Sequence, residues 1–344
     1  MKKIFTLILV ILSIESFSQD TIYLQNIKQN AIPLTKSEIR LGFETKGVSN
    51  INVLDSEIMI VSYTKPKDGF YYSIYSINDH KKISDIITAD EDDKGMISPC
   101  LTIMNNEIMI SSTLSKKYTI IPIKSLHESN PEINIITGII TLPAILHNDS
   151  LIITDWYYFE DTASNISNKR NSRFLINAKD KSAINSTNFF SNFKYNTASL
   201  NGGDFASNSR TLIFGSSSYP KIEVLNNDLT TKKCIIIENI PLKHYIIPEW
   251  NIIATAPYSF SGCKSIVNTD TGFFILYHGI YIDSPNLEIK TSYIISLDKD
   301  ANFIKSYSCQ GEIISISPKM GDSIIYISER IDNEIKFYKL KFDE

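Results

Sequence analysis

Short strand-forming runs separated by turn residues recur along the whole of this 344-residue chain. The runs contain isoleucine, tyrosine, phenylalanine and valine, and asparagine, aspartate, glycine or lysine ends each one, as in antiparallel hairpins. The tetrapeptide Glu-Ile-Met-Ile occurs twice, beginning at Glu57 and at Glu107. This internal repeat limits the fold to architectures in which similar units pack against one another.

The repeat predicts six copies of one hairpin. The copies have equivalent positions at intervals of 43 to 61 residues, namely Ile58, Ile108, Leu151, Leu212, Phe273 and Ile324. Such intervals suit one four-stranded blade each, with the hairpin as the second and third strands. We therefore predict an all-β fold, a six-bladed β-propeller of antiparallel blades. Seven blades are the alternative, because residues 235–260 contain enough strand for a partial extra blade.

The N-terminal strand is predicted to close the ring. The last copy ends at Leu340 and so lacks a fourth strand, while Thr21–Gln25 forms a lone strand with no hairpin partner nearby. Pairing of Thr21–Gln25 with Ile335–Leu340 would supply the missing strand and remove an open sheet edge. A parallel β-helix would need a shorter period, and tandem β-sandwiches would show linkers, which the sequence lacks.

The N-terminus has the pattern of a secretory signal peptide. Lys2 and Lys3 precede an apolar run from Ile4 to Ile14, and small residues flank Phe17 just before Gln19. The run is too short for a transmembrane anchor, and no cysteine follows it to carry a lipid. We expect residues 1–18 to be removed and residues 19–344 to form a single exported domain, periplasmic or secreted, with no membrane insertion afterwards.

Charge and cysteine content exclude several classes of protein. Lys and Arg total 34 against 38 Asp and Glu, with no long basic cluster, so a nucleic-acid partner is not expected. The four cysteines, Cys100, Cys234, Cys263 and Cys309, would permit disulfides outside the cytoplasm. None forms a C-x-x-C pair, and small buried thiols are the favoured interpretation.

The C-terminal half, from Arg210 to Phe342, resembles the TolB-like six-bladed β-propeller family of exported bacterial proteins. Three segments carry the resemblance: Arg210–Phe214 with Lys221–Leu225, Gly272–Gly279, and Tyr293–Tyr307. These resemble two patterns of the family, namely tyrosine, long apolar strand, glycine, and strand, Asp-x-x-Gly/Asn, strand. The resemblance implies the propeller fold and export, and it implies no catalytic residues.

Candidate ligand-binding residues fall in loops that join second to third strands. Such loops gather on one face of a propeller together with the loops between blades. We predict a ligand-binding rim there, where rings stack on a ligand and carboxylates accept its donors. The rim residues are Asp155, Trp156, Tyr157, His278, Tyr281 and Asp283. Because Trp156 to Phe159 would alternate between the two faces of an extended segment, half of them are expected in the core.

No catalytic or cofactor motif is present. The segment from Gly215 to Tyr219 lacks the second glycine of a nucleophile elbow, and the five histidines stand singly. Asp90 to Asp93 lacks the ligand spacing of a calcium loop. The sequence therefore favours a non-catalytic protein without metal or cofactor that binds a protein, peptide or glycan of the cell envelope. The alternative is a channel-sited hydrolase, a metal-assisted lactonase or a glycosidase.

Overall fold

The fold is seen in a computed structural model that is almost entirely β-strand where it is described. One 3-10 helix, η1 (Ile123–His127), occurs among the described residues, and no helix there is long and apolar enough to cross a membrane. The structure describes residues 20–24, 26–65, 69–86, 100–104, 107–112, 117–128, 132, 134–137, 140–141, 144–148, 151–154, 157–158, 172–177, 183–188, 203–208, 210–217, 219–238, 244–247, 252–255, 260–281, 289–318, 324–332 and 334–342.

Within these residues, six sheets have four or five strands, and we number them 1 to 6 in chain order. In sheets 1 to 3 the neighbouring strands are antiparallel and follow one another along the chain. Sheet 1 contains β4 (Val48–Val53), β5 (Ile58–Lys65), β6 (Gly69–Ser76) and β7 (Lys82–Ile86); sheet 2 contains β8 (Cys100–Met104), β9 (Glu107–Ser112), β10 (Lys117–Pro122) and β11 (Asn134–Thr137); sheet 3 contains β13 (Ala144–Asn148), β14 (Leu151–Thr154), β16 (Ser172–Asn177) and β17 (Ala183–Asn188).

Sheets 4 to 6 repeat this order, and each gains one strand from the N-terminal region. Sheet 4 contains β18 (Gly203–Ser207), β19 (Leu212–Ser216), β20 (Lys221–Leu225) and β21 (Thr231–Ile236) with β1 (Asp20–Tyr23); sheet 5 contains β24 (Phe260–Asn268), β25 (Gly272–Tyr281), β26 (Thr291–Asp298) and β27 (Phe303–Gln310) with β2 (Ile32–Pro33); sheet 6 contains β28 (Glu312–Pro318), β29 (Ile324–Ile331) and β30 (Glu334–Lys341) with β3 (Lys36–Ile39).

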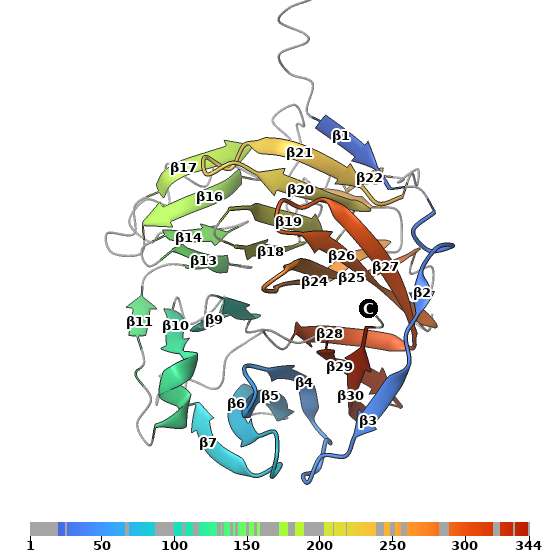
Figure 1. The fold of residues 1–344 in the computed structure, drawn as a ribbon. Helices are drawn as coiled ribbons and strands as arrows, with labels where there is room; N and C mark the ends of the chain where they lie inside the picture. The colour runs from blue at the N-terminus through green and yellow to red at the C-terminus, as the bar shows by residue number, and fades with distance from the viewer. Residues whose placement is uncertain are drawn as a thin grey trace, which may run out of the picture.

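The repeated hairpins occupy the positions that the sequence predicts. Each of the six equivalent residues lies in the second strand of its sheet, and the following strand pairs with it. Figure 1 shows the sheets succeeding one another in chain order, with sheet 6 beside sheet 1. Sequential four-stranded antiparallel sheets packed face to face are the architecture of a β-propeller. Two pairs lie outside these sheets: β12 (Ile140–Thr141) with β15 (Tyr157–Tyr158), and β22 (His244–Ile247) with β23 (Ile252–Thr255).

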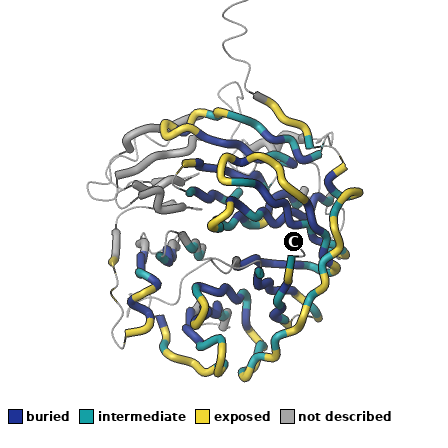
Figure 2. Tube along the Cα trace, in the orientation of Figure 1, coloured by how far each residue is buried: buried dark blue, intermediate teal, exposed yellow. Residues whose placement is uncertain are grey.

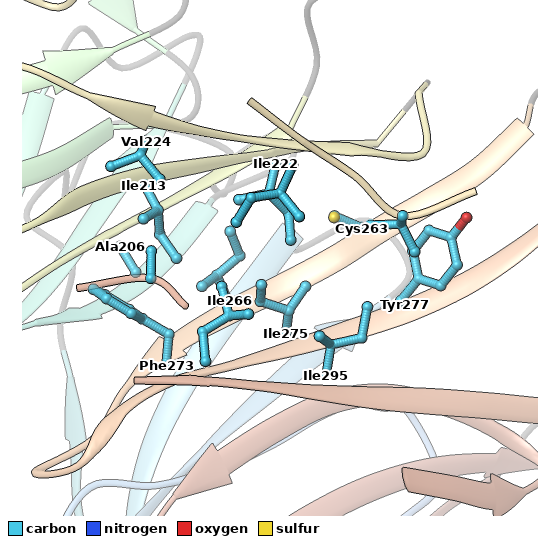
Figure 3. Close-up of a cluster of buried hydrophobic side chains, with 14 of the residues drawn as sticks. Ala206, Ile213, Ile222, Val224, Cys263, Ile266, Phe273, Ile275, Tyr277 and Ile295 are labelled. Atoms are coloured by element: carbon cyan, nitrogen blue, oxygen red, sulfur yellow. The ribbon is translucent and has the colours of Figure 1, made fainter. Parts of the chain in front are cut away.

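The hydrophobic core lies between the sheets, where buried apolar residues of neighbouring sheets pack together in the described part of the chain. Ile51 and Met59 of sheet 1 pack with Phe337 of sheet 6, which joins the first and last sheets. Figure 3 shows the layer between sheets 4 and 5, where Ile213 and Ile222 face Ile275. Figure 2 shows that burial is greatest along the inner strands and declines toward the outer ones.

Residues 20–39, here called the N-terminal belt, run along the outer edges of three sheets (Figure 1). β1 pairs in parallel with β21 of sheet 4, β2 pairs in parallel with β27 of sheet 5, and β3 pairs antiparallel with β30 of sheet 6. The belt is therefore a series of edge strands that ties sheets 4, 5 and 6 together.

The predicted pairing of Thr21–Gln25 with Ile335–Leu340 is wrong. Thr21 lies opposite Cys234 in sheet 4, and Lys36–Ile39 supplies the outer strand beside β30. The sequence Lys-Ser-Glu-Ile is mostly polar and has little strand propensity, so its pattern gives no signal. Tertiary contacts select it, since Ile39 packs into the layer between sheets 6 and 1.

Candidate functional site

A polar pocket of about 270 Å³ lies at one end of the strands of sheets 4 and 5. Three turns surround it: one between β18 and β19, one between β20 and β21, and one between β26 and β27. Its lining residues come from the first two turns and strands of sheet 4, with one from sheet 5, and are Arg210, Thr211, Val224, Leu225, Asn226, Asn227, Lys232, Lys233 and Asp300.

Two of these turns have the same local structure. In residues 226–230 the N–H of Leu229 donates to the carbonyl of Asn226, and in residues 298–302 the N–H of Ala301 donates to that of Asp298. Leu229 and Ala301 have φ of 66° and 59°, in the left-handed region that disfavours side chains with a Cβ. Both side chains are fully buried, so packing stabilises a conformation that an isolated turn would give to glycine.

Aspartate side chains hold the same two turns rigid. The Asp298 carboxylate accepts the N–H groups of Asp300 and Asn302, at 2.9 and 2.8 Å. The Asp228 carboxylate accepts the N–H and the hydroxyl of Thr230, and these hydrogen bonds lower the pKa of Asp228 below its ordinary value. The wall of the pocket is therefore formed by turns with fixed backbone geometry.

Cations predominate among the charged groups of the pocket. Lys233 Nζ donates to Ala301 O (3.1 Å) and Asn302 Oδ1 (3.0 Å), so it links sheet 4 to the turn of sheet 5. Among the described residues, the Arg210 guanidinium, the Lys232 ammonium and the Asp300 carboxylate make no hydrogen bond or ion pair. The pocket thus combines a fixed cation with two free ones and one free carboxylate.

In sheet 5 the pocket lies at the opposite strand ends from Tyr281, one of the predicted rim residues. Gly272 begins β25 opposite Asp298, beside the pocket, and β25 ends at Tyr281 at the other end of the sheet. Asp155, Trp156 and Asp283 lie outside the described residues. The backbones of Tyr157, in β15, and of Tyr281, opposite Phe260, are described. The rim prediction has no described geometry that brings these residues together.

His278 is buried between sheets 5 and 6. Its side of β25 faces β28, and it is 1% exposed. Nε2 lies 2.9 Å from the carbonyl oxygen of Ile313, and Nδ1 lies 3.1 Å from the hydroxyl of Ser261. Because a carbonyl only accepts, Nε2 carries the proton and Nδ1 accepts from the hydroxyl. Burial lowers the pKa of His278 to about 4, so the neutral ring links the two sheets.

Asp204 occupies the corresponding place between sheets 4 and 5. Asp204 belongs to β18. Its carboxylate accepts the N–H of Ile266 in β24 at 2.8 Å and that of Phe205 at 3.0 Å. Burial raises the pKa of Asp204 to about 6, although both hydrogen bonds oppose the rise. With both oxygens bonded to backbone donors, this carboxylate joins two sheets and is not available as an acid or base for a ligand.

Close packing at this point requires glycine at Gly215, which lies opposite Asp204. A Cβ at Gly215 would lie 2.8 Å from Cys263 Sγ and 2.8 Å from Ile266 Cδ1. Cys234, Cys263 and Cys309 are free thiols, and burial raises the pKa of each. The interpretation as buried thiols is confirmed for Cys263 and Cys309, whereas Cys234 is only partly buried. The raised pKa values favour the protonated thiols, so none of the three is poised as a nucleophile.

The pocket residues could not be found by sequence reasoning. Lys232 and Lys233 are adjacent in one strand, Arg210 is 22 residues earlier, and Asp300 belongs to another sheet. Only the tight packing of two turns brings them together. Within the described part of the chain, no group of three or more His, Cys, Asp and Glu could hold a metal ion.

Solved structures of the same overall fold come from Bacteroides. A candidate exported protein of Bacteroides fragilis aligns with a TM-score of 0.56 at 10% identity, over 94% of this chain and 99% of that one. A member of the DUF4221 family from Bacteroides vulgatus aligns with a TM-score of 0.54 at 12% identity, over 91% and 99%. These similarities show a shared fold.

A third match is more distant. The WD40 domain of Toxoplasma gondii coronin has a TM-score of 0.47 at 8% identity, over 92% of this chain and 89% of that one. No family model matches the sequence, and no curated protein matches it significantly.

Proposed function

We propose that this chain is an exported, non-catalytic binding protein built on a TolB-like ring of six propeller blades. Sheets 1 to 6 would be the blades, and β3 would close the ring by completing sheet 6. The packing of Ile51 and Met59 against Phe337 supports closure, because it joins the first sheet to the last. Hydroxyls support it further, since Ser315 and Ser328 donate to the carbonyl of Ile51 across the same junction.

Export is supported by the N-terminal sequence. Residues 1–18 have the charge, apolar length and small residues of a signal peptide. The Bacteroides fragilis protein of similar fold carries a name that describes it as a candidate exported protein. The mature chain would then begin at Gln19, in the periplasm or outside the cell, without a lipid anchor.

The pocket between sheets 4 and 5 is the observation that carries the binding function. It offers hydrogen-bond donors and acceptors on rigid turns, and it contains no histidine, cysteine or serine beside a base. Such a lining can recognise a ligand but supplies no activated nucleophile. The ligand we propose is a protein, peptide or glycan of the cell envelope, a group of which enters the pocket.

Binding of the mature protein to arrays of bacterial envelope glycans and peptides tests this function. Asn227→Trp fills the pocket from an exposed position, Trp156→Ala with Tyr157→Ala removes the predicted rim, and Ile83→Trp on exposed β7 is the bulky control. We expect the first variant to lose binding and the control to retain it. Loss only in the rim variant would move the site to the opposite face, and an absence of binding to both arrays would refute the proposal.

A further inference from the structure

The charge of the pocket contrasts with that of the whole molecule. Arg210, Lys232 and Lys233 against Asp300 give the lining a formal charge of +2, whereas the chain has a formal net charge of −4. A concave site whose sign is opposite to that of the protein attracts small anions. The charged lining residues therefore favour a negatively charged ligand.

The cationic groups are arranged around the pocket by fixed backbone. Asn208 Oδ1 accepts the N–H groups of Arg210 and Thr211, each at 2.8 Å. These bonds fix the backbone from which the Arg210 side chain extends. Lys233 is fixed by two acceptors in the turn of sheet 5, and an ammonium has three donors, so one remains. Arginine and lysine that converge from separate elements can bind several oxygens of one anion.

Size and charge together indicate the class of ligand. A volume of about 270 Å³ lies just below the usual range for ligand pockets, about 300–1,000 Å³, and suits one charged group with a short body. A formal charge of +2 suits an oxyanion, which is a phosphate monoester with up to two negative charges or a sulfate ester with one. Asp300 would repel a second anionic group, but its carboxylate can accept a hydroxyl hydrogen.

We propose that this pocket binds a phosphate or sulfate ester on a hydroxylated body, such as an acidic sugar unit of an envelope glycan. Arg210 and Lys232 would bind the ester oxygens, Lys233 would contribute its remaining donor, and Asp300 would accept a hydroxyl of the body. This assignment rests on the proposed binding function and names the chemistry that the pocket selects.

The test is calorimetric titration of the mature protein with glucose 6-phosphate, glucose 6-sulfate, inorganic phosphate and glucose. We expect both esters to bind at least tenfold more tightly than glucose, with an affinity that falls as salt is added. The double variant Arg210→Gln, Lys232→Gln should lose at least tenfold. Lys305→Gln, an exposed lysine on the outer strand β27, is the matched control and should bind as the wild type does.

The substitution Asp300→Asn should change the affinity for inorganic phosphate in the direction opposite to that of the double variant. Removing the carboxylate should strengthen binding of inorganic phosphate severalfold, because a repulsive charge is lost, and should reduce the advantage of the sugar ester over it. Folding of each variant is checked by its thermal transition. If the double variant binds the esters as tightly as the wild type, or if no oxyanion binds, the assignment is wrong. Binding of neutral glycans or peptides in that case would leave the proposed function standing, whereas no binding on either array would refute both.

Discussion

The interface between sheets 4 and 5 and the interface between sheets 5 and 6, here called the first and the second seam, have the same three components. Each has an apolar layer, one titratable side chain bonded to backbone of the neighbouring sheet, and one lysine of the N-terminal belt at its outer end. The titratable group is Asp204 in the first seam and His278 in the second. The lysines are Lys28 and Lys36, respectively.

The two lysines differ in how deeply their partners are buried. Lys28 Nζ binds Glu238 (3.0 Å) and the carbonyl of Gly279, and the Glu238 side chain is 21% exposed. Lys36 Nζ binds both oxygens of Glu329 and the carbonyl of Gln310 (2.7 Å), and the Glu329 side chain is only 4% exposed. The stability of the second seam therefore depends on the Lys36–Glu329 ion pair. In the first seam, water can replace part of the Lys28–Glu238 pair, because that glutamate is more exposed.

Gly311 adds a steric requirement to the second seam. Its φ is +104°, and a Cβ there would lie 1.6 Å from a carboxylate oxygen of Glu329. Only glycine leaves room for the carboxylate between the end of sheet 5 and the start of sheet 6. The N-terminal belt therefore stabilises both seams, but it neutralises a buried charge only through Lys36.

Lys36→Met should have the largest effect. The substitution keeps an apolar stem but leaves the Glu329 carboxylate buried without a cation, which costs about 3–5 kcal/mol of the free energy of unfolding. Urea denaturation at pH 7 measures the loss. The double variant Lys36→Met, Glu329→Gln is the control, and it should recover most of the stability because the buried charge is gone.

Recovery is the decisive part of this experiment. If the double variant is as unstable as the single one, the lysine stabilises the protein through its cation–π contact with the Tyr338 ring, whose centroid lies 4.9 Å from Nζ, and not by neutralising Glu329. The burial of Glu329 would then not explain the difference between the two seams.

His278 should make stability depend on pH. The folded pKa of about 4 lies below the ordinary 6.5, so the unfolded chain binds more protons between these values and stability falls as pH drops from 6.5 to 4. The full difference corresponds to about 3 kcal/mol. His278→Gln, whose amide can still donate to Ile313 O, should abolish this part of the dependence in urea titrations from pH 4 to 7. An unchanged slope would contradict the burial of a neutral ring.

Asp204 should change the free energy of unfolding in the opposite direction to His278, over nearly the same pH range. Its folded pKa of about 6 lies above the ordinary 3.8, so the folded protein binds more protons and stability falls as pH rises from 3.8 to 6. The effect is at most about 3 kcal/mol, and less because water screens a partly exposed residue. The two groups offset one another in the wild type, and Asp204→Asn should reveal the His278 slope at its steepest. If both single variants keep the wild-type profile, the two seams are not coupled to pH.

The sequence predicted the repeats because hairpins are local. Ile58, Leu212 and Ile324 begin runs whose period and turns are visible in a few residues, and all three lie in second strands. The belt could not be predicted, since Lys36–Ile39 is polar and joins sheet 6 through contacts with residues some 300 positions away. Cross-sheet contacts of this kind leave no periodic signal in the chain.

The candidate site was predicted less well than the fold, for the same reason. His278 was expected on the rim as a ligand contact, and the structure shows it buried with both ring nitrogens bonded to the protein, while its ligand-binding role stays untested. The pocket depends on Arg210 and Asp300 meeting across two turns. Turn chemistry was visible in the sequence, but the distance between turns of different sheets was not.

Lys28→Met should have the smallest effect and so completes the comparison. Glu238 keeps a hydrogen bond from the Tyr277 hydroxyl at 2.8 Å and remains partly exposed, so water can solvate the carboxylate when the lysine is lost. For a partly exposed pair we expect a loss of about 1 kcal/mol in urea denaturation at pH 7, well below that of Lys36→Met. Tyr277→Phe in the Lys28→Met background removes the remaining partner and should add to the loss. If Lys28→Met alone destabilises the protein as much as Lys36→Met, burial of the glutamate does not set the difference between the seams, and the belt stabilises both through its backbone pairing with β21, β27 and β30.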